Sequence, residues 1–319
     1  MIHEKDNIVK KVRLLTILFV CAVTIVIIHG SINIKMLCRN SKDIVFSDMI
    51  RNIEMTESEA ARIFVTDTSP EGVKYVSGIN NHVMKNITYK MMYKSVCALG
   101  NIDVQTEKMP YMFRNMADKH IYKEIYNRYK SIYKDVKMFP VPNDYLGKIE
   151  TPYENSWGSA REYVGESAKE NAKDESAQNG ARKHEGTDIM AGNNERGYFP
   201  VISMTDGIVE KKGWLELGGY RIGIRSPGGA YFYYAHLADY ADGIEEGVVV
   251  KAGDIIGTMG DTGYGKEEGT IGKFDVHLHL GIYLNCKNED GTETEISYNP
   301  YYILKSVEKF KKEFVDNNS

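Results

Sequence analysis

Four of the eight histidines in this 319-residue chain lie in segments whose residue types and spacing suit a metal ion. Asp188 follows His184 by four residues, which gives a His-x-x-x-Asp spacing, and His236 follows an aromatic run. His277 and His279 form a His-x-His pair. Zinc binds imidazole nitrogen and carboxylate oxygen, and a catalytic zinc keeps one position open for water. These segments therefore indicate a zinc site that could hydrolyse a substrate.

The His-x-His pair is the most informative of these segments. Because strand side chains alternate between faces, His277 and His279 point to one side, while Val276, Leu278 and Leu280 point to the other. One imidazole can then bind the metal while its neighbour stands over the open coordination position. Zinc lowers the pKa of a bound water to about 7, and a neutral histidine nearby can take the proton.

Each segment also has a purely structural explanation when it is taken alone. A single His-x-His pair in a strand is more often held by ordinary hydrogen bonds, since buried polar groups usually find partners. Three such segments in one glycine-rich region are hard to explain by chance, and together they favour a metal site. Glu185 is not expected to be the base of a His-Glu-x-x-His protease, because no second histidine follows at that spacing.

The elements that must position these residues are short β-rich runs separated by glycine turns. Examples are residues 207–209, 220–224 and 230–234, and they begin after the prolines of Phe139-Pro140-Val141-Pro142. We therefore predict an antiparallel β domain over residues 139–305.

A polar insertion, residues 166–181, interrupts this domain and has no large apolar residue to bury. We expect a surface loop there, because such insertions cost little entropy. A lid over the site or a processing site is the alternative.

Residues 14–34 are predicted to be a transmembrane anchor. They form an almost purely apolar run of 21 residues, about 31 Å of helix, which is long enough to cross a bilayer. The denser basic flank is N-terminal, so we expect residues 1–13 in the cytoplasm and the rest of the chain outside it. A cleaved signal peptide is the rival interpretation, but Ile28-His29-Gly30 fits a cleavage site poorly.

Residues 35–138 are predicted to form a small helical region. Thr56 and Glu59 have the spacing of a capping box. Within residues 117–137, apolar side chains recur at spacings of three and four, which gives one stripe on a helix: Tyr122, Ile125, Tyr129, Ile132 and Val136. We expect this stripe to be a buried face, with binding of a protein partner as the alternative.

The composition excludes several classes of protein. The chain is 42% apolar and 26% charged, with a net charge of −4, so it is neither a disordered tail nor a basic nucleic-acid binder. Four cysteines are too few for a disulfide framework. Together with a C-terminal tail at 306–319, the elements predict an α+β chain with the β domain as its largest part.

Several motifs in residues 139–304 resemble those of the lysostaphin/LytM-type family of zinc metallopeptidases. Beyond the histidine segments, Asn155-Ser156-Trp157-Gly158-Ser159-Ala160-Arg161 is similar to the family's opening motif. The turns Thr205-Asp206-Gly207, Gly253-Asp254-Ile255-Ile256-Gly257 and Gly260-Asp261-Thr262-Gly263 match its recurrent turns. The resemblance implies a lysostaphin-like antiparallel sheet, duplicated or barrel-like, with zinc in a groove.

The resemblance also implies a role for each site residue. His184, Asp188 and His279 would hold one zinc ion per chain. His277 would be the general base, and His236 would orient the attacking water or stabilise the oxyanion.

The implied function is a membrane-anchored endopeptidase that cuts peptidoglycan peptides. A non-catalytic scaffold or activator of cell-wall hydrolases, built on the same fold, is the alternative, as is an enzyme released by signal cleavage.

Overall fold

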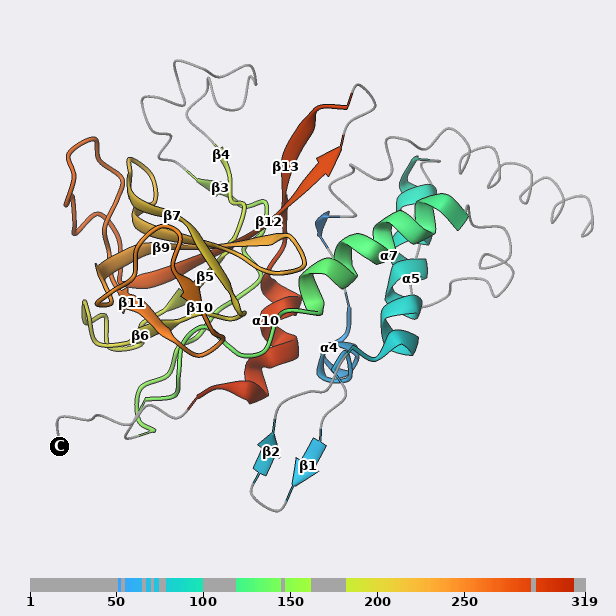
Figure 1. The fold of residues 1–319 in the computed structure, drawn as a ribbon, viewed down its shortest axis with the longest axis horizontal. Helices are drawn as coiled ribbons and strands as arrows, with labels where there is room; N and C mark the ends of the chain where they lie inside the picture. The colour runs from blue at the N-terminus through green and yellow to red at the C-terminus, as the bar shows by residue number, and fades with distance from the viewer. Residues whose placement is uncertain are drawn as a thin grey trace, which may run out of the picture. The chain divides into compact units, whose positions relative to one another are not determined.

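The computed structural model describes most of the chain beyond residue 50 (Figure 1). The described residues are 51–52, 55–64, 67–69, 72–74, 79–99, 119–144, 147–161, 182–287 and 291–312. They belong to two compact units, the first comprising Met1–Ile50 and Thr88–Ile125 and the second Arg51–Ile87 and Tyr126–Ser319. The predicted anchor and the polar insertion lie outside the described residues. Within the described ranges, no helix has both the length and the apolar character needed to cross a membrane.

An antiparallel sheet of nine strands forms the largest part of the second unit (Figure 1). Its strands are β5 (Thr187–Met190), β6 (Pro200–Ile202), β7 (Gly207–Leu215), β8 (Gly219–Arg225), β9 (Ala230–Tyr240), β10 (Val249–Val250), β11 (Ile255–Met259), β12 (His277–Lys287) and β13 (Glu293–Tyr298). The order β10-β7-β8-β9-β11-β6 is extended by β12, which pairs with β9, β5 and β13. The predicted antiparallel β domain is confirmed, and the three predicted runs fall in β7, β8 and β9.

Alternation along the strands separates a core face from a site face. On β9, Phe232 and Tyr234 are fully buried, and on β12 Leu278 and Leu280 are fully buried as well. The residues between them, including Tyr233 and His279, point to the opposite face. The sheet therefore holds its polar face rigidly over a packed apolar layer.

Two described helices bear on the predictions for residues 35–138. Helix α4 (Glu57–Ala61) begins with the predicted capping box, since Glu59 N–H donates to Thr56 Oγ1 and the Glu59 carboxylate accepts from Thr56 N–H. Helix α7 (Lys119–Tyr133) carries the predicted apolar stripe as far as Ile132, whereas Val136 lies beyond the end of the helix. In its C-terminal part, Tyr129 and Ile132 are buried, and the Tyr129 ring packs edge-on against Tyr298 of β13 at 5.5 Å.

The same region contains further elements. Helix α5 spans Asn81–Leu99, and a short hairpin joins β1 (Asp67–Ser69) to β2 (Gly72–Lys74). Strands are thus present in addition to the predicted helices.

Packing continues beyond the predicted domain boundary at residue 305. Helix α10 (Tyr301–Val307) crosses that boundary and is followed by a 3₁₀ turn, η2 (Glu308–Phe310). Val307 and Phe310 are buried, and Phe139 N–H donates to Phe310 C=O at 3.3 Å. Apolar residues at helical spacing continue past residue 305, so residues 306–310 form part of the packed structure rather than a free tail.

Candidate metal centre

Strand pairing brings the predicted site residues together. In the antiparallel ladder of β5 and β12, His279 lies directly opposite Asp188, and His277 lies opposite Met190. On its other side His279 pairs with Ala235 of β9. Directly paired residues share a face of the sheet, so Asp188 and His279 emerge side by side.

His236 reaches this face through a bulge in β9. Tyr220 of β8 pairs with Leu237 and Ile222 pairs with Tyr234, so Arg221 alone faces Ala235 and His236. The backbone of His236 has a φ of +63°, and its N–H donates to Gly218 C=O at 2.8 Å. A positive φ is strained for a residue with a Cβ, and strained bulges often re-aim a side chain at a functional site.

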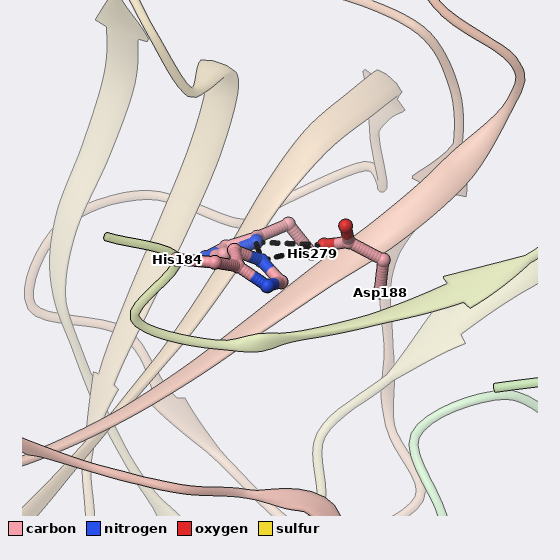
Figure 2. Close-up of side chains that lie close together, drawn as sticks. All are labelled: His184, Asp188 and His279. Carbon is pink, nitrogen blue, oxygen red and sulfur yellow. Dashed lines mark hydrogen bonds and ion pairs between the residues drawn. The ribbon is translucent and has the colours of Figure 1, made fainter. Parts of the chain in front are cut away.

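Three donor atoms converge at the centre of this face (Figure 2). His184 Nε2 lies 3.1 Å from Asp188 Oδ1 and 3.0 Å from His279 Nδ1. His279 Nδ1 lies 2.9 Å from the same Asp188 oxygen. Neighbouring ligand atoms on a tetrahedral zinc, with bonds of about 2.0–2.1 Å, are about 3.3–3.4 Å apart. The two nitrogens and one oxygen thus fit zinc in chemistry and, within a few tenths of an ångström, in spacing.

The protonation states of these groups also suit a metal. Burial alone would raise the pKa of Asp188, but hydrogen bonds with His184 and His279 hold it well below its usual range. Burial lowers the pKa of His279 to about 4. Near pH 7 the carboxylate is therefore ionised and the His279 imidazole neutral, which are the forms that bind a metal.

Comparison with known proteins agrees with this arrangement. The sequence profile of peptidase family M23 matches residues 182–291. A solved structure of a LytM-type protein from Ruminococcus gnavus, described as a glycyl-glycine endopeptidase, is 36% identical with a TM-score of 0.58. That similarity covers 86% of this chain and 95% of the other. The chain belongs to peptidase family M23.

Two other proteins resemble parts of this M23 chain. The L-Ala–D-Glu endopeptidase of Bacillus subtilis is 39% identical over 173 residues, which are 54% of this chain and 44% of that protein. This chain therefore spans less than half the length of that relative. The catalytic domain of lysostaphin from Staphylococcus simulans is 25% identical, over 49% of this chain and 92% of the other, with a TM-score of 0.33.

Two further imidazoles of the M23 domain stand beside the three donor atoms. The His236 and His277 rings are 4.7 Å apart between centroids, and His277 Nε2 lies 3.8 Å from Asp188 Oδ1. Nδ1 of His236 lies 2.7 Å from Thr262 C=O, and Nδ1 of His277 lies 2.7 Å from Asp275 C=O. Because a carbonyl can only accept, each Nδ1 carries the hydrogen and each neutral ring keeps its lone pair on Nε2.

Arg161 contacts two of the predicted ligands through atoms other than their donor atoms. It comes from β3 (Ala160–Arg161), which pairs with β4 (Arg182–Lys183). Its guanidinium forms an ion pair with Asp188 Oδ2, and Nη2 lies 2.9 Å from His184 Nδ1. The Ser156 hydroxyl also lies 3.1 Å from that His184 nitrogen. Such outer contacts fix the orientation of metal ligands.

All five predicted site residues lie together in the second unit, and their individual roles stay predictions. Sequence reasoning assigned no role to Arg161 or Ser156, although both belong to the opening motif that it singled out. The structure also shows that a side chain at Gly186 would overlap His279.

Proposed function

We propose that this chain is a zinc metalloendopeptidase that hydrolyses peptide bonds in bacterial peptidoglycan. The observation that carries the proposal is the convergence of His184, Asp188 and His279 beside two imidazoles with Nε2 lone pairs. Membership of family M23 supports the reaction class. The similarity to an L-Ala–D-Glu endopeptidase supports a stem-peptide substrate.

In the proposed reaction, the metal ligands and His277 have separate roles. A zinc ion held by the three ligands would polarise a carbonyl and lower the pKa of a water to about 7. His277 would accept a proton on Nε2 and return it to the leaving amine, as a general base and then a general acid.

His236 has a different role from His277 in the proposed reaction. Its Nδ1–H is bound to Thr262 C=O, and burial lowers the pKa of the imidazole well below its ordinary value. The neutral ring can accept a hydrogen bond at Nε2 but cannot donate one there. This favours orientation of the attacking water by His236 over stabilisation of an oxyanion.

We also propose that residues 14–34 anchor the enzyme in the cell membrane as a single span, with the peptidase domain outside the cytoplasm. The apolar run and its basic N-terminal flank support this placement. Peptidoglycan lies on that side of the membrane. Separation of the membrane fraction, with the mass of the mature N-terminal fragment, distinguishes an anchor from a cleaved signal.

The reaction is tested with the full chain loaded with zinc and incubated with purified peptidoglycan. We expect about one zinc per chain, new amino groups, and fragments whose masses identify the bond that is cut. Substitution His277→Ala should reduce the rate by about 10²–10⁴-fold. His82→Ala, which removes an exposed histidine of α5, is the matched control and should leave the rate unchanged.

Chelation should abolish the activity, and zinc should restore it. Zinc-loaded chain that releases no new amino groups from several peptidoglycan types would contradict the proposal and favour the non-catalytic scaffold.

A further inference from the structure

A groove with a volume of about 600 Å³ runs along the site face of the sheet, and His236 and His279 contribute to its lining. Its aromatic lining comes from Tyr231, Tyr233 and Tyr283. Measured between ring centroids, Tyr233 lies 6.1 Å from His279 and 6.4 Å from Tyr283, and Tyr231 lies 6.2 Å from Tyr283. Two residues of the site and a row of tyrosines thus line one groove, in which a peptide could bind.

Glycines on the neighbouring strands leave room for these rings. Gly223 and Gly281 both pair with Tyr233 in the ladder, and a Cβ on Gly223 would come 1.7 Å from the Tyr231 hydroxyl oxygen. A Cβ on Gly281 would come 2.8 Å from the Tyr283 ring. Tyrosine rings thus fill the space that side chains at these glycines would occupy.

The charged residues that line the groove are mostly paired. Glu185 is 3.5 Å from Arg51, and Glu295 is 3.3 Å from Arg225. Arg182 donates to the Tyr264 hydroxyl at 3.1 Å.

Arg221 is different from these residues. Among the described residues, no carboxylate lies within ion-pair distance of its guanidinium, and its buried Nη1 has no hydrogen-bond partner. Nη1 itself is closed to solvent, so a substrate anion would be bound by the part of the guanidinium that lines the groove, where no carboxylate of the described residues pairs with it.

Arg221 also lies next to the reacting centre. It is the single β8 residue opposite the bulge that carries His236. Adjacent strands are about 4.8 Å apart, so the backbone of Arg221 lies beside the backbone of the bulge. Arg221 also lines the same groove as His236 and His279, so a substrate group that it binds is expected close to the bond that the site would cut.

We infer that Arg221 selects a substrate residue with a free carboxylate next to the scissile bond. The inference rests on the proposed peptidase function. A carboxylate is the anion that peptides offer, and a guanidinium binds it through two parallel hydrogen bonds. A glutamyl residue fits, since it has two carboxyl groups and the peptide chain continues through only one. The bond for which the Bacillus subtilis relative is named, L-Ala–D-Glu, has such a residue on its C-terminal side.

The test uses two synthetic stem peptides that differ in one group. One has a glutamyl residue with a free carboxylate after the scissile bond, and the other has the carboxamide there. For zinc-loaded wild-type chain we expect a kcat/KM about 10- to 100-fold higher for the carboxylate peptide. Arg221→Gln should remove this preference by slowing the carboxylate peptide alone, and Arg221→Lys should retain part of it.

Two controls separate Arg221 from other positive charges. Arg62→Gln makes the same change at the exposed C-cap of α4, where Nε donates to Ser58 C=O. Arg182→Gln makes it at the other arginine of the groove. The preference should survive both changes. Equal cleavage of the two peptides by the wild type, or a preference that survives Arg221→Gln, would overturn the inference.

Binding to the His277→Ala chain, measured by calorimetry, makes the inference independent of turnover. Preferential, Arg221-dependent binding of the carboxylate peptide without cleavage by wild-type chain would refute the proposed function and leave the inference standing. Cleavage of both peptides at equal rates would support the proposed function and overturn the inference. Equal or undetectable binding of both peptides, with no difference in cleavage, would overturn the inference.

Discussion

Gly186 lies against the imidazole of His279, and the two residues are packed so closely that only glycine fits. A Cβ at position 186 would come 2.3 Å from His279 Cε1 and 2.7 Å from the backbone oxygen of Leu280. The Leu280 oxygen belongs to the paired strand β12, so neither neighbour can move away without disturbing the ladder or the ligand.

Gly186→Ala should therefore weaken zinc binding at least about tenfold and destabilise the fold by about 1–3 kcal/mol. Zinc affinity is measured by competition with a chromophoric chelator, and stability by denaturant unfolding. Gly269→Ala is the control, since nothing lies within 4 Å of its Cβ and φ is +85°. It should cost about 1–2 kcal/mol of backbone strain and leave zinc affinity unchanged. Wild-type zinc affinity in Gly186→Ala would show that the close contact does not position His279.

Arg161→Gln should lower zinc affinity by about 10- to 100-fold through the loss of an outer contact. The ion pair of Arg161 with Asp188 Oδ2 leaves Oδ1 directed at His184 and His279. Because Arg161 acts through Asp188, saturating zinc should restore most of kcat. Arg182→Gln is the matched control, since Arg182 lies opposite Arg161 in the β3–β4 pair. A variant that binds zinc normally but stays inactive would instead place Arg161 in contact with the substrate.

Local pattern was sufficient to predict part of this site. The period of two along a strand placed His277 and His279 on one face, and the structure confirms that Leu278 and Leu280 are buried behind them. Proximity of His184 and Asp188 also follows from a short spacing within one turn and strand. These features depend on neighbours in sequence, which periodicity describes well.

The remaining features depend on pairing between distant segments. The bulge that directs His236 into the site is a one-residue irregularity between β8 and β9, and the aromatic run before it reads as a regular strand. The proximity of Arg221 to this bulge follows from the same register. Arg161 reaches Asp188 because β3 and β4 pair across residues 162–181. No single segment carries information about such registers, so the roles of Arg161 and Arg221 could be inferred only from the structure.

Acid should weaken the contribution of Asp206 to folding. Lys137 Nζ donates to Asp206 Oδ2 at 2.5 Å, and Ala252 N–H donates to Oδ1 at 2.9 Å. These bonds, the Lys137 bond above all, lower the pKa of Asp206 in the folded chain. The unfolded chain then binds more protons near its ordinary pKa of about 3.9, so the stabilisation is present above that pH and is lost as the pH falls further.

The measurement is the free energy of unfolding of wild type and Asp206→Asn across pH. The difference between the two should be constant above about pH 5 and shrink below about pH 4. Asp242→Asn, which changes an exposed carboxylate, is the control for the loss of one charge. A difference that grows as the pH falls would have the wrong sign for this account.

The hydroxyl of Tyr234 should stabilise the core without affecting the metal site. It accepts a hydrogen bond from Met204 N–H at 2.9 Å, and both residues are fully buried. Tyr234→Phe leaves that backbone N–H without this partner, which should cost about 1–3 kcal/mol in the free energy of unfolding. Zinc affinity should not change, because Tyr234 points to the core face of β9. Tyr126→Phe removes a hydroxyl that donates to Asn81 Oδ1 at an exposed position, so it should cost less than about 0.5 kcal/mol. A Tyr234→Phe variant as stable as the wild type, or one with weakened zinc binding, would contradict this separation of the core face from the site face.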